Sequence, residues 1–155
     1  MTKFDFQFQK ILDLKGNEKD YARVQMADAI KRHEAGYQKK ETIVSKITNA
    51  EQLMKEKQQK GMNISELREL ESYIYQLQTQ LMSSNRELEH LQKNVLKTQN
   101  HLQLKSQEQK VWDNLKEQKK DQHIEKNKII EQNFFDELAS TRFYRLAKAS
   151  LAERG

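Results

Sequence analysis

The sequence predicts an all-α protein, a long two-helix antiparallel coiled-coil hairpin with a protruding C-terminal helix. Three observations predict this fold. The 155 residues include no proline, the residue that breaks helices by removing a backbone donor. They include only four glycines, so few positions favour a bend. The apolar residues recur at alternating spacings of three and four, as in coiled coils. We therefore expect residues 1–155 to form a single hairpin.

The first helix is predicted over about residues 3–58. Its apolar seam is predicted at Met26, Ile30, His33, Tyr37, Val44 and Ile47. A slightly different phase continues it through Ile43, Ile47, Ala50 and Met54. Nearer the start, Phe4, Phe8, Ile11 and Leu12 share a face. The weaker pattern of this helix leaves its packing less defined than that of the second helix.

A turn is predicted over about residues 59–64. Gly61 can adopt the left-handed conformation that ends a helix. Asn63 can cap the next helix, and Glu66 follows at the capping-box offset. A short loop makes the two helices antiparallel neighbours. The alternative is one continuous helix that pairs with a second chain.

The second helix is predicted over about residues 65–150. Its seam consists of Leu67, Leu70, Ile74, Leu77, Leu81, Leu88, Leu91, Val95 and Leu102. Ser84 and Thr98 occupy seam positions and weaken it. Beyond Leu102 the register meets Lys105, whereas Val111 and Leu115 indicate a change of phase.

The two arms of the hairpin are unequal, since sixty residues precede Gly61 and ninety-four follow it. About thirty C-terminal residues should therefore extend beyond the paired region. Their apolar face contains Phe134, Phe135, Leu138, Phe143, Leu146 and Leu151. An exposed apolar face implies a partner. The alternatives are self-association and packing against a bent N-terminus.

Composition excludes several function classes. The net charge of +5 comes from interspersed basic and acidic residues, which is typical of solvated helix faces rather than of nucleic-acid binding. There is no cysteine, no glycine cluster for phosphate, and only half of a di-iron motif at Glu87 and His90. We therefore expect no catalytic residue, cofactor, metal or small-molecule ligand. Without a signal peptide or an apolar span, the chain is expected to be cytoplasmic.

Two surface clusters remain as candidate binding sites. Tyr73 and Tyr75 flank the seam near the turn, and aromatic residues off a seam are enriched at binding hot spots. Residues 141–148 interleave arginine and lysine with aromatic residues, which suits an acidic protein surface, an anionic membrane or nucleic acid. The competing interpretation of the two tyrosines is that they merely flank the seam. The competing interpretation of residues 141–148 is a solvated helix end.

Residues 6–15 form an aromatic and leucine opening, and Glu18, Ala22 and Ala29 follow it. Here most strongly, the chain resembles the FliJ family of flagellar export proteins. Residues 112–117 and 136–139 are similar to the family's charged stretch and its acidic-aliphatic segment. The stalk proteins of virulence-type secretion systems look similar.

The resemblance implies a stalk that binds the hexameric export ATPase, promotes its assembly and activity, and couples it to the membrane export gate. Export chaperones are further implied partners. Such a protein would lie at the cytoplasmic face of the membrane. The implied gate contacts are Tyr73, Leu77, Ile43 and Ile47. The implied ATPase contacts form a terminal cluster of Phe4, Phe8, Arg142, Phe143, Tyr144 and Arg145. The alternatives are a virulence-type stalk and a generic cytoplasmic coiled-coil scaffold.

Overall fold

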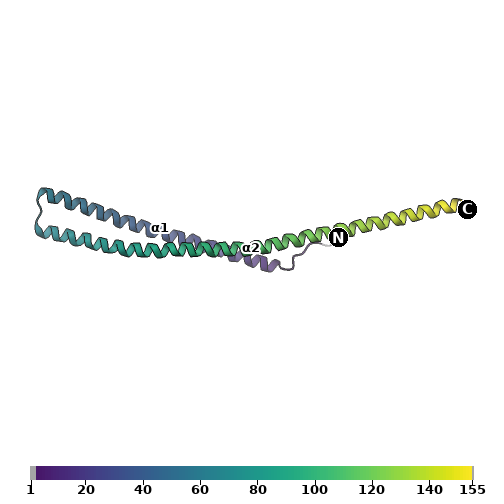
Figure 1. Cartoon of the computed structure of the whole chain (residues 1–155), viewed down its shortest axis with the longest axis horizontal. Helices are drawn as coiled ribbons and strands as arrows, with labels where there is room; N and C mark the ends of the chain where they lie inside the picture. The colour runs from purple at the N-terminus through teal and green to yellow at the C-terminus, as the bar shows by residue number, and fades with distance from the viewer. Residues whose placement is uncertain (1–2, 155) are drawn as a thin grey trace. The chain divides into compact units, whose positions relative to one another are not determined.

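The computed structural model describes residues 3–154 and contains two long helices within them. Helix α1 spans Gln9–Lys60 and helix α2 spans Ile64–Arg154 (Figure 1). The described residues include no strand. The chain divides into two compact units: residues 17–106, and residues 1–16 together with 107–155. The predicted helical hairpin is confirmed, whereas the single domain over 1–155 stays a prediction.

The turn between the helices forms where the sequence places it. Gly61 has a φ of 90°, the left-handed conformation that a residue with a Cβ adopts only with strain. Asn63 then caps α2, because its Oδ1 accepts a hydrogen bond from the Ser65 N–H at 3.4 Å. Its backbone carbonyl accepts another from the Leu67 N–H at 3.1 Å. Helix α1 ends two residues later than predicted, and α2 begins one residue earlier.

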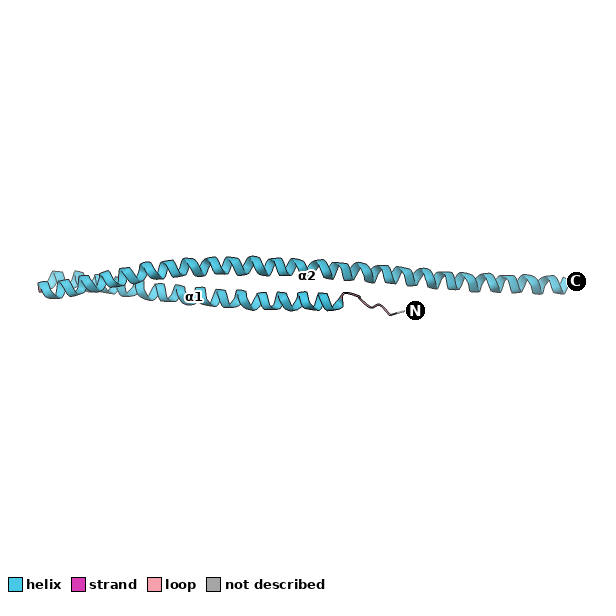
Figure 2. Cartoon of the chain, turned by 90° about the horizontal axis from the view of Figure 1, so that it is seen from below, coloured by secondary structure: helices cyan, strands magenta, loops and turns pink. Residues whose placement is uncertain are grey.

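Within residues 17–106, α1 and α2 run side by side and antiparallel from this turn (Figure 2). The core positions of α1 follow a single seven-residue repeat, in which Ala22, Ala29, Ile43 and Ala50 are buried and Gly36 is partly buried. The predicted seam position of Ile30 and Tyr37 is wrong, since they are 45% and 47% exposed. Small residues occupy four of these five positions, so a pattern of large apolar side chains favours the neighbouring positions instead.

The small residues allow α1 to lie close to α2. A Cβ built on Gly36 would lie 2.8 Å from Leu91 Cδ1 and 3.6 Å from Leu88 Cδ1. The leucines thus fill the space that a side chain on α1 would take. Nearer the turn, Ala50 packs with Ile74 and Leu77, and the partly buried neighbours of this cluster are Ile47, Met54 and Leu70. The interface is narrow, as expected for a two-helix fold.

The seam also contains polar residues, and they are accommodated rather than excluded. Ser84 is buried, yet no buried side-chain polar atom in the described chain lacks a hydrogen-bond partner. Lys105 occupies a seam position of α2 and its Nζ lies 3.3 Å from Glu18 Oε2 on α1. Pairing across the helices reduces the cost of placing an ammonium group beside apolar neighbours.

The second unit also contains a lysine–glutamate pair between the two helices. Lys15 Nζ lies 3.1 Å from Glu108 Oε2, and Trp112 follows on the seam of α2. The predicted change of phase is not observed at Val111, which is exposed, although Leu115 is partly buried. Lys15 at a seam position does not end the pairing of the helices, because its ammonium group forms an ion pair with Glu108 of the other helix.

The N-terminal segment 3–8 is not helical, so the predicted start of the first helix at residue 3 is wrong. Its aromatic rings pack on α2 instead. The ring centroids of Phe8 and Trp112 are 5.7 Å apart, and those of Phe4 and His123 are 5.6 Å apart. Phe6 is buried beside Phe8. Non-helical backbone rises further per residue than a helix, which carries Phe4 farther along α2 than helical pairing would.

Replacement of Phe8 by alanine is expected to shift the fluorescence of Trp112 to longer wavelength, because the indole loses an apolar neighbour and gains water. Trp112 is the single tryptophan of the chain, so the signal has one source. The loss of an aromatic pair should cost about 0.5–1.5 kcal/mol of local stability. A matched control is Phe135→Ala on the exposed part of α2. An unchanged Phe8→Ala spectrum would contradict the packing.

The tail, defined as residues 124–154, is the continuation of α2 beyond the N-terminal segment. Every side chain from Lys128 to Glu153 is exposed. The predicted protruding helix is therefore confirmed. Neither helix of the described chain contains a stretch apolar enough to cross a lipid bilayer.

Candidate interaction surfaces

The residues proposed to contact an export gate lie near the turn, within residues 17–106. Tyr73 is 45% exposed on α2, beside the seam. Leu77 is only 3% exposed, and Ile43 is 7% exposed. Ile47 packs against the cluster that contains Leu77. The Tyr73 ring is thus accessible, whereas the three aliphatic residues lie in the seam, where the sequence pattern also places them.

A second exposed face of α2 was not predicted in full. Tyr75, Met82 and Leu96 are all more than half exposed. They are separated by multiples of seven residues on α2, so they share a face away from the seam. Only Tyr75 was singled out from the sequence. The spacing is the signal that identifies the others.

The terminal residues predicted to act together occupy two separate places in their unit. Phe4 and Phe8 are partly buried against α2, where their partners are His123 and Trp112. Arg142 follows His123 on the same helix by 19 residues, or about 28 Å at the helical rise. The structure therefore does not bring the two phenylalanines together with residues 142–145, and the expectation of one terminal cluster is wrong.

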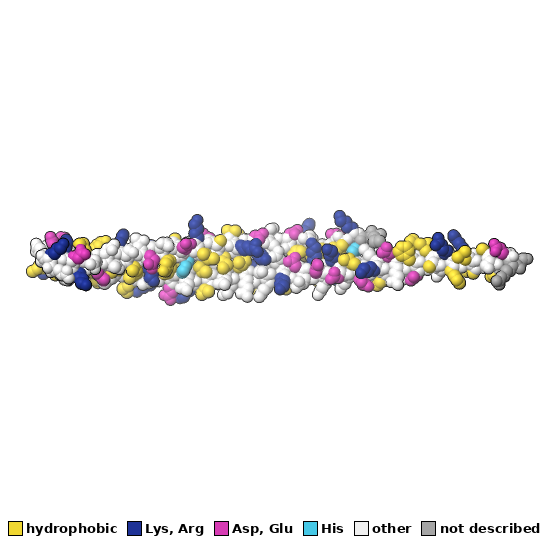
Figure 3. All heavy atoms as spheres, turned by 90° about the horizontal axis from the view of Figure 1, so that it is seen from above, with side chains coloured by type: hydrophobic (Ala, Val, Ile, Leu, Met, Phe, Trp, Pro, Cys, Tyr) yellow, Lys and Arg dark blue, Asp and Glu magenta, His cyan; other side chains and the backbone are white. Residues whose placement is uncertain are grey.

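The C-terminal part of the tail combines apolar and basic side chains. Phe143 and Tyr144 are 75% and 67% exposed. Residues 138–152 include Arg142, Arg145 and Lys148 but no aspartate or glutamate. Figure 3 shows hydrophobic groups next to Lys and Arg near the C-terminal end. Such a surface suits an acidic partner with apolar patches.

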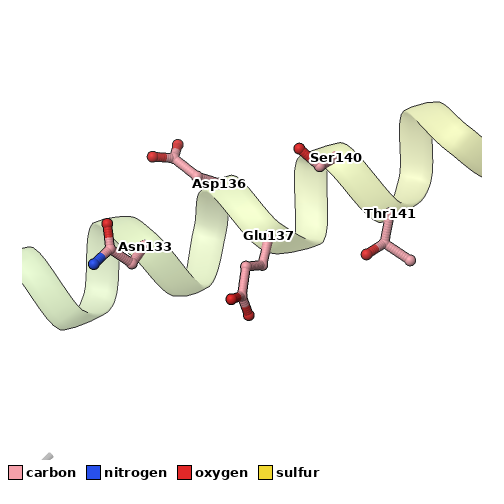
Figure 4. Close-up of a pocket in the computed structure, with 5 residues that line it drawn as sticks. All are labelled: Asn133, Asp136, Glu137, Ser140 and Thr141. Carbon is pink, nitrogen blue, oxygen red and sulfur yellow. The ribbon is translucent and has the colours of Figure 1, made fainter.

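One depression in the tail is lined by Asn133, Asp136, Glu137, Ser140 and Thr141. All five residues come from one helix, and Figure 4 shows Asp136 and Glu137 pointing to different sides of it. It is therefore an open helix surface without converging groups. The described residues contain no group of side chains suited to hold a metal ion. The candidate sites are exposed helix faces.

These features define a class: a coiled-coil hairpin whose candidate binding surfaces are exposed helix faces beside the turn and on the tail. The family described as "Flagellar FliJ protein" matches residues 4–148, and the chain belongs to this FliJ family. A relative named "Flagellar FliJ protein" from Bacillus subtilis (strain 168) is 24% identical over 147 residues, covering 90% of this chain and 95% of the relative. No solved structure matches. The chain is thus related to flagellar protein export.

Proposed function

We propose that this protein is the stalk of the flagellar export apparatus. In this role it binds the hexameric export ATPase, promotes assembly and activity of the ring, and couples the ring to the membrane export gate. It acts at the cytoplasmic face of the membrane, and export chaperones are additional partners. Family membership over residues 4–148 supports the flagellar role.

The single observation that carries the ATPase contact is the exposed tail. Phe143 and Tyr144 lie on a helix that no other described segment covers, next to Arg142 and Arg145. Large apolar side chains left in water favour burial in a partner, and arginines beside them select an acidic one. We assign the ring contact to these four residues. Phe4 and Phe8 instead fasten the N-terminal segment to α2.

The proposed gate contact centres on Tyr73. A half-exposed tyrosine supplies large contact area at low entropic cost, which is common at binding hot spots. The role of Leu77, Ile43 and Ile47 is indirect. Their packing in the seam holds the backbone of α2 in the position that exposes Tyr73.

The direct test is to add the purified chain to the cognate export ATPase and measure ATP hydrolysis. We expect hydrolysis to rise with the concentration of added chain and to saturate. Addition of the isolated cytoplasmic domain of the gate tests the second contact by calorimetry. A coiled-coil scaffold without either contact would change neither measurement.

A further inference from the structure

The apolar side chains of the tail follow a different repeat from those of the hairpin. Ile124, Phe135 and Leu146 are each eleven residues apart, and all three are exposed. Eleven residues make three turns of an almost straight helix, so these positions lie on one face. Phe134 and Leu138 border the same face. We call these five residues the tail stripe. A helix that covers it would follow the tail with little left-handed supercoiling.

Two arginines lie within the tail stripe. The neighbours of Arg142 three and four residues away are Leu138, Ala139, Arg145 and Leu146, so none is acidic. Arg145 likewise has no acidic residue at these spacings. Neither arginine forms an ion pair with another described residue, and neither does Glu131. A partner that covers the stripe must therefore supply groups that interact favourably with the charges of Arg142, Arg145 and Glu131.

The charges of the tail are arranged symmetrically about Leu138. Glu131 precedes Leu138 by seven residues, and Arg145 follows it by seven. Phe134 precedes it by four, and Arg142 follows it by four. In an antiparallel pair of tails with the two Leu138 side chains opposite each other, Arg145 of each copy faces Glu131 of the other. Arg142 faces the ring of Phe134, a favourable cation–π arrangement.

We propose that the tail stripe is an interface between two copies of this chain, which pair antiparallel about Leu138. The contact is isologous, so each favourable pair occurs twice. It buries the apolar side chains that one copy leaves exposed and gives both arginines a partner. The interface is independent of Phe143 and Tyr144, which point away from the stripe by helical spacing. Arg142 and Arg145 are shared with the proposed ATPase contact, so the paired form and the ring-bound form exclude each other.

The test uses charge reversal in the full chain and sedimentation velocity over a concentration series. The wild type should approach twice the 18.5 kDa mass of one chain. Arg145→Glu places four glutamates at the two ion-pair positions, and Glu131→Arg places four arginines there. Each variant alone should dissociate at least about tenfold more readily, because like charges then face each other. An equimolar mixture of the two variants should restore the dimer, since every facing pair is again of opposite charge.

Matched controls separate this interface from general charge effects. Glu137→Arg makes the same charge change as Glu131→Arg on another face of the helix and should leave the dimer intact. A wild type that stays monomeric, or a mixture that fails to restore pairing, would overturn the proposal. Dimerisation that persists after removal of residues 124–155 would overturn it too. Glu131→Arg is outside the proposed ATPase contact, so it should retain stimulation of the ATPase whether or not the chain pairs.

Discussion

Removal of residues 137–155 is expected to abolish stimulation of the export ATPase and to leave the hairpin folded. The deleted residues include the four proposed to contact the ring: Arg142, Phe143, Tyr144 and Arg145. Every described side chain among them up to Glu153 is exposed, so the deletion removes no packing from the rest of the chain. Helical circular dichroism should fall in proportion to the missing residues, and the unfolding midpoint should hold.

A narrower variant identifies which tail residues act on the ATPase. Phe143→Ala with Tyr144→Ala removes the two exposed rings and leaves the tail stripe unchanged. Stimulation should drop toward the rate of the ATPase alone, whereas the mass measured by sedimentation should match that of the wild type. Phe4→Ala is the companion control, because Phe4 packs on His123 and is not assigned to the ring. Full stimulation by the truncated chain would contradict the proposed ATPase contact.

Leu77→Ala should lower the free energy of unfolding by about 2–4 kcal/mol, because it removes a nearly buried side chain and leaves a cavity in a narrow core. Tyr73→Ala should cost below about 1 kcal/mol, since the ring is half exposed. Urea unfolding followed by circular dichroism measures both values. The comparison distinguishes Leu77, which stabilises the hairpin, from Tyr73, which is exposed and contributes little to its stability.

Gate binding should show the opposite order when it is measured at a temperature where both variants remain folded. Tyr73→Ala is expected to weaken binding of the gate domain by about thirtyfold, the effect of losing a 2 kcal/mol hot spot. Leu77→Ala should weaken it less, provided that the helix keeps its position. Tyr75→Ala, on another face of α2, is the control and should bind normally. Equal loss for Tyr73→Ala and Tyr75→Ala would contradict a contact centred on Tyr73.

The sequence predicted the parts of the fold that depend on local chemistry. Gly61 and Asn63 end one helix and begin the next because their conformations and hydrogen bonds act within a few residues. The seam of α2 was also predictable, since leucine and isoleucine repeat there. The exposed tail followed from the unequal lengths of the two arms.

Features that depend on contacts between distant residues were missed. Gly36 faces Leu88 and Leu91, and a pattern of large apolar residues cannot detect a glycine at a core position. The rings of Phe4 and Phe8 hold segment 3–8 out of the helix by packing on α2, which helical spacing alone did not indicate. For Leu77 the apolar pattern predicted a seam position and the family resemblance implied a gate contact, and its 3% exposure agrees with the seam position.

Two of the lysine–glutamate pairs across the helices, Lys105–Glu18 and Lys15–Glu108, restrict how the hairpin can assemble. If α1 slid by one heptad, Lys105 would meet Gln25 or Ile11 in place of Glu18, and Lys15 would meet His101 or Leu115 in place of Glu108. Each lysine would then enter the interface without a carboxylate, at a cost that the native alignment avoids. Alanine and glycine fit many apolar surfaces and distinguish poorly between such alignments. The charged pairs therefore disfavour misaligned folding products, which a seam of small residues alone would tolerate.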